Sequence, residues 1–144
     1  MTSNTNKPNR LFWIIGVIAL IWNSMGIDGY INQVYQTKRF KTMYTEEQLE
    51  IIFNLPSYVT AAFAIAVFSS VIASILFLLR KKLAKTFFLI GLIAVSVQTF
   101  YNVFLNPGKE MYRTVEYSML ILIPLFALFL YWYTKKCADD GILN

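Results

Sequence analysis

The sequence predicts an all-α membrane protein with four transmembrane helices, and two observations carry that prediction. Hydrophobic residues make up 57% of the 144 residues and charged residues only 15%, a balance typical of membrane proteins. Apolar stretches of about 20 residues, each long enough at about 1.5 Å per helical residue to cross a bilayer core, cover residues 11–30, 57–79, 86–105 and 115–133. We therefore expect a four-helix transmembrane domain over residues 11–134.

Polar segments flank this domain on both sides. Residues 1–10 are rich in Asn, Thr and Ser, so we expect a mobile tail there, and we expect residues 135–144 to form a cytoplasmic tail. Lys7 and Arg10 before an apolar run resemble the start of a signal peptide. The run is long, however, and residues 22–25 offer no small-x-small cleavage site, which predicts an uncleaved first helix.

The distribution of Lys and Arg predicts that both termini lie in the cytoplasm. Of the 13 basic residues, eight then lie on the inner side and five in the outer loops, and basic residues are enriched in cytoplasmic loops. The inner set is Lys7, Arg10, Arg80, Lys81, Lys82, Lys85, Lys135 and Lys136, and the outer set is Lys38, Arg39, Lys41, Lys109 and Arg113. The outer loops also carry five carboxylates, Glu46, Glu47, Glu50, Glu110 and Glu116.

The first outer loop contains the signal of a short amphipathic helix. Thr45 followed three residues later by Gln48 is a capping-box pattern, and apolar residues at i, i+3, i+4 spacing begin at Leu49. Such a helix can lie on the outer membrane surface, pack on top of the bundle as an ordinary loop, or offer a peripheral interaction surface. Pro56 suits the first turn of the next helix.

The second apolar span carries a repeat of small residues, Ala62, Ala66, Ser70 and Ser74. Small residues four apart line one helix face and let a neighbouring backbone approach closely, which is how helices associate in lipid. Packing within the monomer is the preferred interpretation, and dimerisation through this face is the alternative. In the fourth span, Pro124 predicts a kink.

Polar residues inside the spans are the candidates for function, because each costs free energy unless it is paired, hydrated or used. Asn23 lies 12 residues after Leu11 and Gln98 lies 12 after Thr86, so both sit about 18 Å from the inner edge. Together with Asn102, Tyr58 and Glu116 they suggest an outward-facing polar pocket, closed on the cytoplasmic half by Ile, Leu and Phe. The simpler interpretation, which we prefer, is that the amides hold neighbouring helices together.

Asp28 is the one carboxylate expected at the edge of a span. It points about 140° away from Asn23 on an ideal helix, so the two share a site only if Gly26 and Gly29 loosen the backbone. Because it lies near a helix C-terminus, where negative charge is unfavourable, we expect a basic partner for it. The candidates on that side of the membrane are Arg113, Lys109, Lys38 and Arg39.

The composition argues against several kinds of site. The chain has no histidine and one cysteine, Cys137, which argues against a zinc site, haem ligation, a Cys-His nucleophile and an internal disulfide. No catalytic residue, cofactor or metal is therefore expected. The net charge of +5 comes from residues that flank the apolar spans and form no stripe, so a nucleic-acid partner is not expected either.

Two segments, residues 20–26 (LIWNSMG) and residues 61–82 (AAFAIAVFSSVIASILFLLRKK), carry a family resemblance. They are similar to a family of small four-helix bacterial inner-membrane proteins commonly annotated "sugar transporter", through a W-N-x-M-G motif and an A-x-A-V-F block that ends in L-L-R-K-K. Ser69 and Ser70 stand where that family often has glycine, and Tyr58 where tryptophan is common. The resemblance implies a four-helix protein of the bacterial inner membrane, and no substrate-binding residues are carried over.

From these observations we expect a non-enzymatic accessory or interaction subunit of a membrane complex. The small size and the scarcity of buried charge favour that function. An oligomeric small-solute, sugar-like transporter is the alternative, because a dimer encloses a pathway more readily than one four-helix bundle. The expected partners are the lipid bilayer and either a larger membrane complex or a second copy of the chain.

Overall fold

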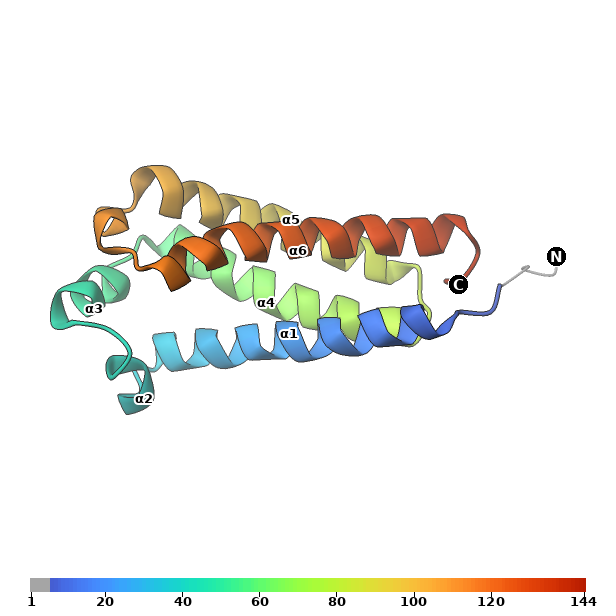
Figure 1. Cartoon of the computed structure of the whole chain (residues 1–144), viewed down its shortest axis with the longest axis horizontal. Helices are drawn as coiled ribbons and strands as arrows, with labels where there is room; N and C mark the ends of the chain where they lie inside the picture. The colour runs from blue at the N-terminus through green and yellow to red at the C-terminus, as the bar shows by residue number, and fades with distance from the viewer. Residues whose placement is uncertain (1–5) are drawn as a thin grey trace.

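The computed structural model describes residues 6–144, and this part of the chain is helical with no strand. Four helices are long and apolar enough to cross a membrane, as the sequence predicts (Figure 1). They are α1 (Arg10–Val34), α4 (Ser57–Leu78), α5 (Leu83–Phe100) and α6 (Thr114–Asp139), and a π-helix, η1 (Tyr101–Leu105), continues α5. Helix α6 runs on through Pro124.

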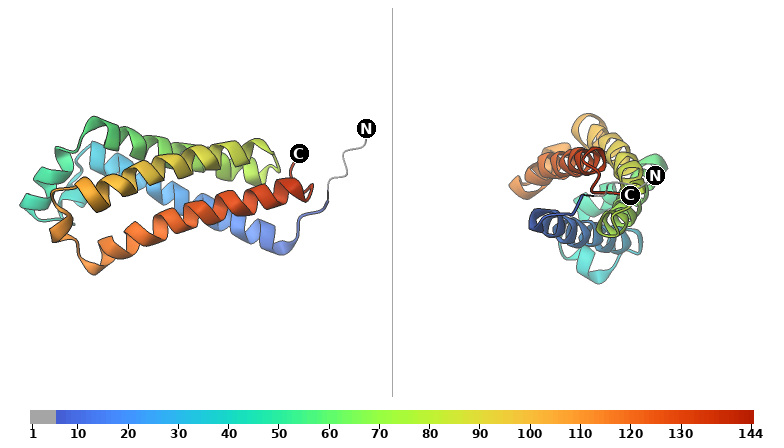
Figure 2. Two further views of the ribbon diagram at one scale, coloured as in Figure 1. Left: turned by 90° about the horizontal axis from the view of Figure 1, so that it is seen from above. Right: turned by 90° about the vertical axis from the view of Figure 1, so that its right-hand side faces the viewer.

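The long helices are arranged in an open arc in the order α1, α4, α5, α6. Helix α4 packs against both α1 and α5, and α6 packs along α5, whereas the backbones of α1 and α6 do not pack together (Figure 2). Both described chain ends lie at one end of the bundle, here called the termini end. The short helices α2 (Lys38–Lys41), α3 (Glu46–Phe53) and η2 (Lys109–Met111) lie at the opposite end, the loop end.

Helix α4 is central because small residues let its neighbours approach closely. Ala62, Ala66 and Ser74 are buried, and Ser70 is partly buried, so the repeat lies within the monomer. On α5, a Cβ added to Gly91 would lie 2.5 Å from Ser70 Oγ, closer than real Cβ atoms come. The small residues of α4 therefore allow α5 and α1 to pack closely against it.

The termini end holds the apolar core. Phe12 of α1 stacks on Phe77 of α4 with ring centroids 4.2 Å apart, and Phe88, Leu130 and Leu143 are buried in the same cluster. Core packing of this kind fills the space between all four helices at this end of the bundle.

The chain ends are fixed to the turn that joins α4 and α5. Arg80 adopts a positive φ of 59°, and its carbonyl accepts a hydrogen bond from the Asn144 N–H at 2.7 Å. The Arg80 side chain donates to the carbonyls of Ile142 (3.0 Å) and Asn6 (2.9 Å). Helix α6 continues to Asp139, so only residues 140–144 of the expected tail are non-helical, and they fold back on this turn.

The expected N-terminal tail lies partly outside the described residues, which begin at residue 6. Within the described part, the Asn6 N–H donates to the carbonyl of Gly141 at 3.0 Å. The Asn9 side chain caps α1 by accepting from the Phe12 N–H at 2.9 Å. Residues 6–9 are thus held to the bundle by hydrogen bonds on both sides.

At the loop end, α3 begins with the predicted capping box. The Thr45 hydroxyl accepts from the Gln48 N–H at 3.2 Å, and the Gln48 side chain accepts from the Thr45 N–H at 3.0 Å. Gln48 also donates to the carbonyl of Met111 at 3.3 Å, which ties α3 to the loop before α6. Pro56 precedes α4 as its N-cap and does not stand in its first turn, because its ψ of 142° is extended.

The close approach at Gly91 makes a first prediction. Gly91→Leu forces α5 away from Ser69 and Ser70, and overpacking of this kind costs about 1–3 kcal/mol. Thermal unfolding in detergent micelles should show a lower midpoint than for the unaltered protein. Gly29→Leu is the matched control, because a Cβ at Gly29 meets nothing within 4 Å. Equal midpoints for the two variants would contradict the proposed packing of α4 on α5.

Candidate functional site

Two adjoining cavities extend from the loop end to the apolar core of the termini end. One, here called the vestibule, has a volume of about 240 Å³ and lies among α3, α4, α5 and α6. The other, here called the seam cavity, has a volume of about 370 Å³ and lies deeper, between α1 and α6. The shared lining residues are Phe63, Val95, Gln98, Met119 and Ile123. The two cavities therefore adjoin across a shared wall, and together they are called the hollow.

The vestibule has a polar lining. Its polar side chains come from all four long helices and from both loops at the loop end, and include Gln33, Tyr44, Thr60, Gln98, Thr99, Asn102, Asn106, Tyr112 and Glu116. Three of the candidates identified from sequence, Gln98, Asn102 and Glu116, meet here. Amides, hydroxyls and one carboxylate can bind a polar ligand or water through hydrogen bonds.

Part of the vestibule wall is an irregular helical turn, η1, that the sequence pattern does not predict. The π-helix η1 carries Asn102, whose carbonyl accepts from the Tyr112 hydroxyl at 3.2 Å. Asn106 donates to Asn102 Oδ1 at 3.1 Å and accepts from the Gly108 N–H at 2.8 Å. Such π-helical turns are rare in proteins as a whole, and those that occur are often found at functional sites. No periodic pattern marks them, although the N-P-G at residues 106–108 does indicate a turn.

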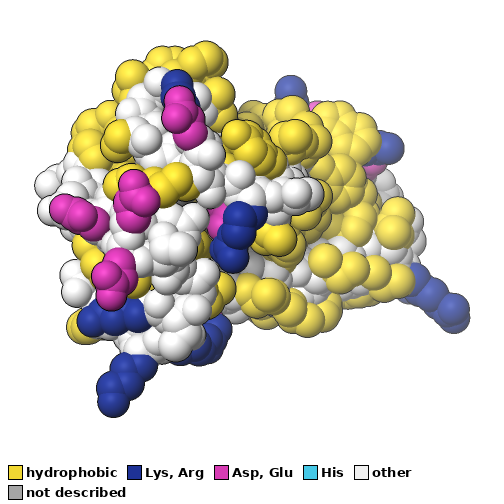
Figure 3. Space-filling model, turned by 60° about the vertical axis from the view of Figure 1, so that its left-hand side comes forward, with side chains coloured by type: hydrophobic (Ala, Val, Ile, Leu, Met, Phe, Trp, Pro, Cys, Tyr) yellow, Lys and Arg dark blue, Asp and Glu magenta, His cyan; other side chains and the backbone are white. Residues whose placement is uncertain are grey.

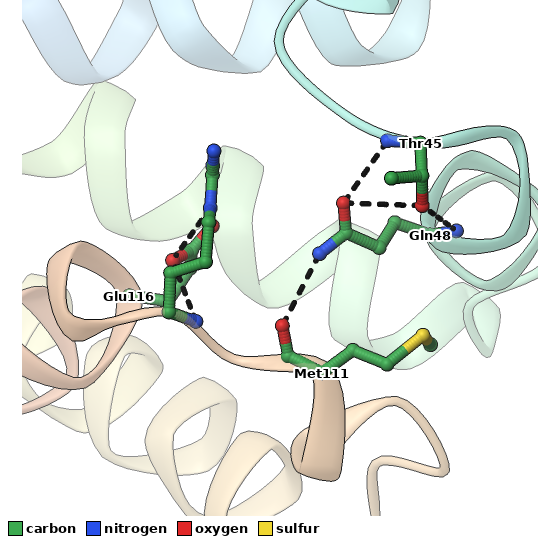
Figure 4. A network of polar contacts seen from close by, with 5 residues as sticks. Thr45, Gln48, Met111 and Glu116 are labelled. Carbon is green, nitrogen blue, oxygen red and sulfur yellow. Dashed lines mark hydrogen bonds and ion pairs between the residues drawn. The ribbon is translucent and has the colours of Figure 1, made fainter.

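Charge in the vestibule is compensated locally. Glu116 accepts hydrogen bonds from the Arg113 guanidinium, the shortest at 2.7 Å, and from the Arg113 N–H at 3.0 Å. The guanidinium also lies 5.8 Å from the ring centre of Tyr44. Figure 4 shows Glu116 in this cluster, beside the bonds that join Gln48 to Thr45 and Met111.

Two tyrosines of the loop end stay protonated near neutral pH. Burial raises the pKa of Tyr112 to about 12, with further contributions from Tyr101, Tyr117 and Glu116. Burial and the Glu116 carboxylate also raise the pKa of Tyr44. Both hydroxyls are therefore neutral hydrogen-bond donors in this part of the site.

The seam cavity is mainly apolar and contains two amides. Asn23 donates to Ser74 Oγ at 3.0 Å and to the Ser70 carbonyl at 3.4 Å, so it links α1 to α4. Gln98 lines both cavities, and within residues 6–144 its side chain makes no hydrogen bond. The two amides that the sequence places at one depth thus line one cavity, but Asn23 bonds to α4 and not to Gln98.

Asp28 and Tyr58 lie outside both cavities. Asp28 pairs with Arg39, one of its four candidate partners, at 2.7 Å, and the two side chains are 53% and 70% exposed. An ion pair this exposed contributes little stability. Tyr58 is exposed and meets Tyr101 edge-on, with ring centroids 6.1 Å apart. The six candidate polar residues therefore do not form one site.

The bond between α1 and α4 makes a second prediction. A double-mutant cycle with Asn23→Leu and Ser74→Ala should show a coupling of about 0.5–1.5 kcal/mol, because each variant removes the same hydrogen bond. The cycle of Asn23→Leu with Gln98→Leu is the control and should be additive. Denaturant unfolding in micelles measures both. Coupling to Gln98 and none to Ser74 would contradict the observed pairing.

Comparison of the chain with known proteins does not identify its family or its function. No family model, no curated protein and no solved structure matches this chain. The residues of its W-N-x-M-G segment have structural roles: Trp22 contacts Phe126 edge-on at 5.4 Å, Asn23 bonds to Ser74, and Gly26 faces Val67. Among residues 6–144, no group of three His, Cys, Asp or Glu side chains is placed to hold a metal ion.

Proposed function

We propose that the protein is a multi-pass protein of the bacterial inner membrane, with the termini end in the cytoplasm. The eight basic residues of the inner set belong to the termini end, at the start of α1, the turn between α4 and α5, and the last turns of α6. The loop end instead mixes basic and acidic side chains, as its surface in Figure 3 shows. A basic cytoplasmic side and a mixed outer side follow the positive-inside rule.

Reporter fusions test this orientation. Fusions after Lys81 and at Cys137 should report a cytoplasmic location, and a fusion at Glu47 should report the opposite side, because the eight-to-five split of basic residues sets the direction of insertion. A periplasmic signal at Cys137 would contradict the proposed topology.

Within the membrane we propose a non-enzymatic role as an accessory subunit of a larger complex. The observation that carries this proposal is the exposure of α6. Only 6% of its apolar span is buried in the bundle, against 39% for α4, and among the long helices its backbone packs closely only along α5. A helix held on one side leaves the other side available to a second subunit. The lack of histidine supports a role without acid–base chemistry.

Site-specific cross-linking tests this role. A photo-cross-linking amino acid at Ile121 or Leu125, on the exposed side of α6, should capture one and the same membrane protein or a second copy of the chain. The same probe at Ile72, on the exposed side of α4, is the control and should capture lipid alone. The adduct is identified by mass spectrometry after gentle-detergent extraction. Identical products from α6 and α4, or none, would contradict the proposed surface.

Transport of a small polar solute is the second candidate. The adjacency of the vestibule and the seam cavity favours it, since only their shared lining side chains separate a polar solute at the loop end from the middle of the span. Beyond that depth the Phe12–Phe77 stack and Leu143 fill the termini end, so transport requires a second conformation. Solute-dependent flux in proteoliposomes that contain only this protein would favour transport over the accessory role.

A further inference from the structure

We infer that the hollow is a binding site for one membrane lipid with a neutral or zwitterionic head, whose acyl chain enters between α1 and α6. This inference concerns the inside of the arc and is independent of the accessory role assigned to the outer side of α6. It rests on the polarity of the two compartments, on the lateral opening between the helices, and on the closed termini end.

The two compartments differ in chemistry along the membrane normal. The vestibule near the loop end is lined by amides, hydroxyls and a carboxylate. The seam cavity below it is lined mainly by apolar side chains, among them Trp22, Met25, Phe63, Phe88 and Phe126. A hollow that is polar at the level of the membrane surface and apolar towards the midplane has the same polarity order as a lipid molecule.

The apolar compartment opens towards the bilayer. The backbones of α1 and α6 do not pack along each other at the seam, where Trp22 and Phe126 are in edge-on contact with ring centroids 5.4 Å apart. On the α1 side, Gly29 lines the cavity and a Cβ there would meet nothing within 4 Å, so there is open space beside α1 at that level. An acyl chain can therefore enter from the side without unfolding a helix.

The far end of the hollow is closed. Phe88 and Leu130 form its floor, and the buried core around Phe12 and Phe77 lies below them. A polar solute would gain little from contact with this floor, whereas an acyl chain that reaches it gains free energy from close packing, which is the main attraction between apolar groups inside a membrane.

The charges that line the vestibule determine which lipid head group it can bind. Within residues 6–144, Glu116 is the one charged side chain that lines the vestibule, and Arg113 neutralises it at 2.7 Å. Gln98 lies at the junction of the two compartments with no hydrogen-bond partner among those residues, so its amide is free to bind the glycerol or head-group oxygens. No unpaired basic side chain lines the described vestibule, which disfavours an anionic head.

Photolabelling in vesicles tests the inference with the full chain. The probe is phosphatidylethanolamine with a photoactivatable group at the end of one acyl chain, diluted into phosphatidylethanolamine–phosphatidylglycerol vesicles. We expect labelled peptides that contain Trp22 or Phe126. Gly29→Leu should reduce that labelling at least tenfold, because the new side chain enters the opening. Ala61→Leu, at an exposed position of α4 outside both cavities, is the matched control and should leave it unchanged.

A second blocking variant, Ala127→Phe on the α6 wall of the seam cavity, guards against misfolding of the first, and the thermal midpoint of each variant is measured alongside. Labelling spread evenly over lipid-facing residues and unchanged by both blocking variants would show bulk lipid only and would overturn the inference. Stronger competition by unlabelled phosphatidylglycerol than by phosphatidylethanolamine would overturn the head-group assignment.

Discussion

The close approach of α5 and α1 to α4 is the constraint on which the rest of the structure depends. In a bilayer the lipid tails are as apolar as leucine, so helices gain little from burying apolar surface and associate through close packing and hydrogen bonds. Helix α4 provides both. Gly91 of α5 sits against Ser69 and Ser70, Gly26 of α1 sits against Val67, and Ser74 accepts the amide of Asn23.

The open arc and its hollow follow from this arrangement. Helices α1 and α5 pack on α4, and α6 packs on α5, so the backbones of the first and last helices do not pack along each other, although Trp22 and Phe126 are in contact. At the termini end large aromatic residues and the folded-back Leu143 fill the space between the helices. Towards the loop end two cavities lie between the helices, lined by amides and hydroxyls as well as by apolar side chains. The same packing thus gives the bundle a solid half and a hollow half.

The sequence predicted much of the fold, because its signals are local. Length and hydropathy indicated four spans, and the spacing of Thr45 and Gln48 indicated a cap for α3. The roles of Gly91 and of the π-helix could not be predicted, since a single glycine in an apolar run carries no pattern and a π-turn depends on its tertiary contacts. The candidate site was less predictable still. Asn23 and Gln98 lie at the same predicted depth in the membrane, and both do line the seam cavity. The hydrogen-bond partner of Asn23 is Ser74 on α4, which depends on how α1 is rotated about its axis and cannot be predicted from depth alone.

Disulfide trapping tests the open arc most directly. In a Cys137→Ser background, the pair Gly26→Cys and Val67→Cys joins α1 to α4, where an added Cβ at Gly26 lies 3.6 Å from Val67 Cβ, within the range of about 3.5–4.5 Å that a disulfide needs. The pair Gly29→Cys and Ile123→Cys faces across the seam cavity. We expect rapid oxidation of the first pair and none of the second. Equal oxidation of both pairs would show that α1 and α6 close the bundle, and would contradict the arc.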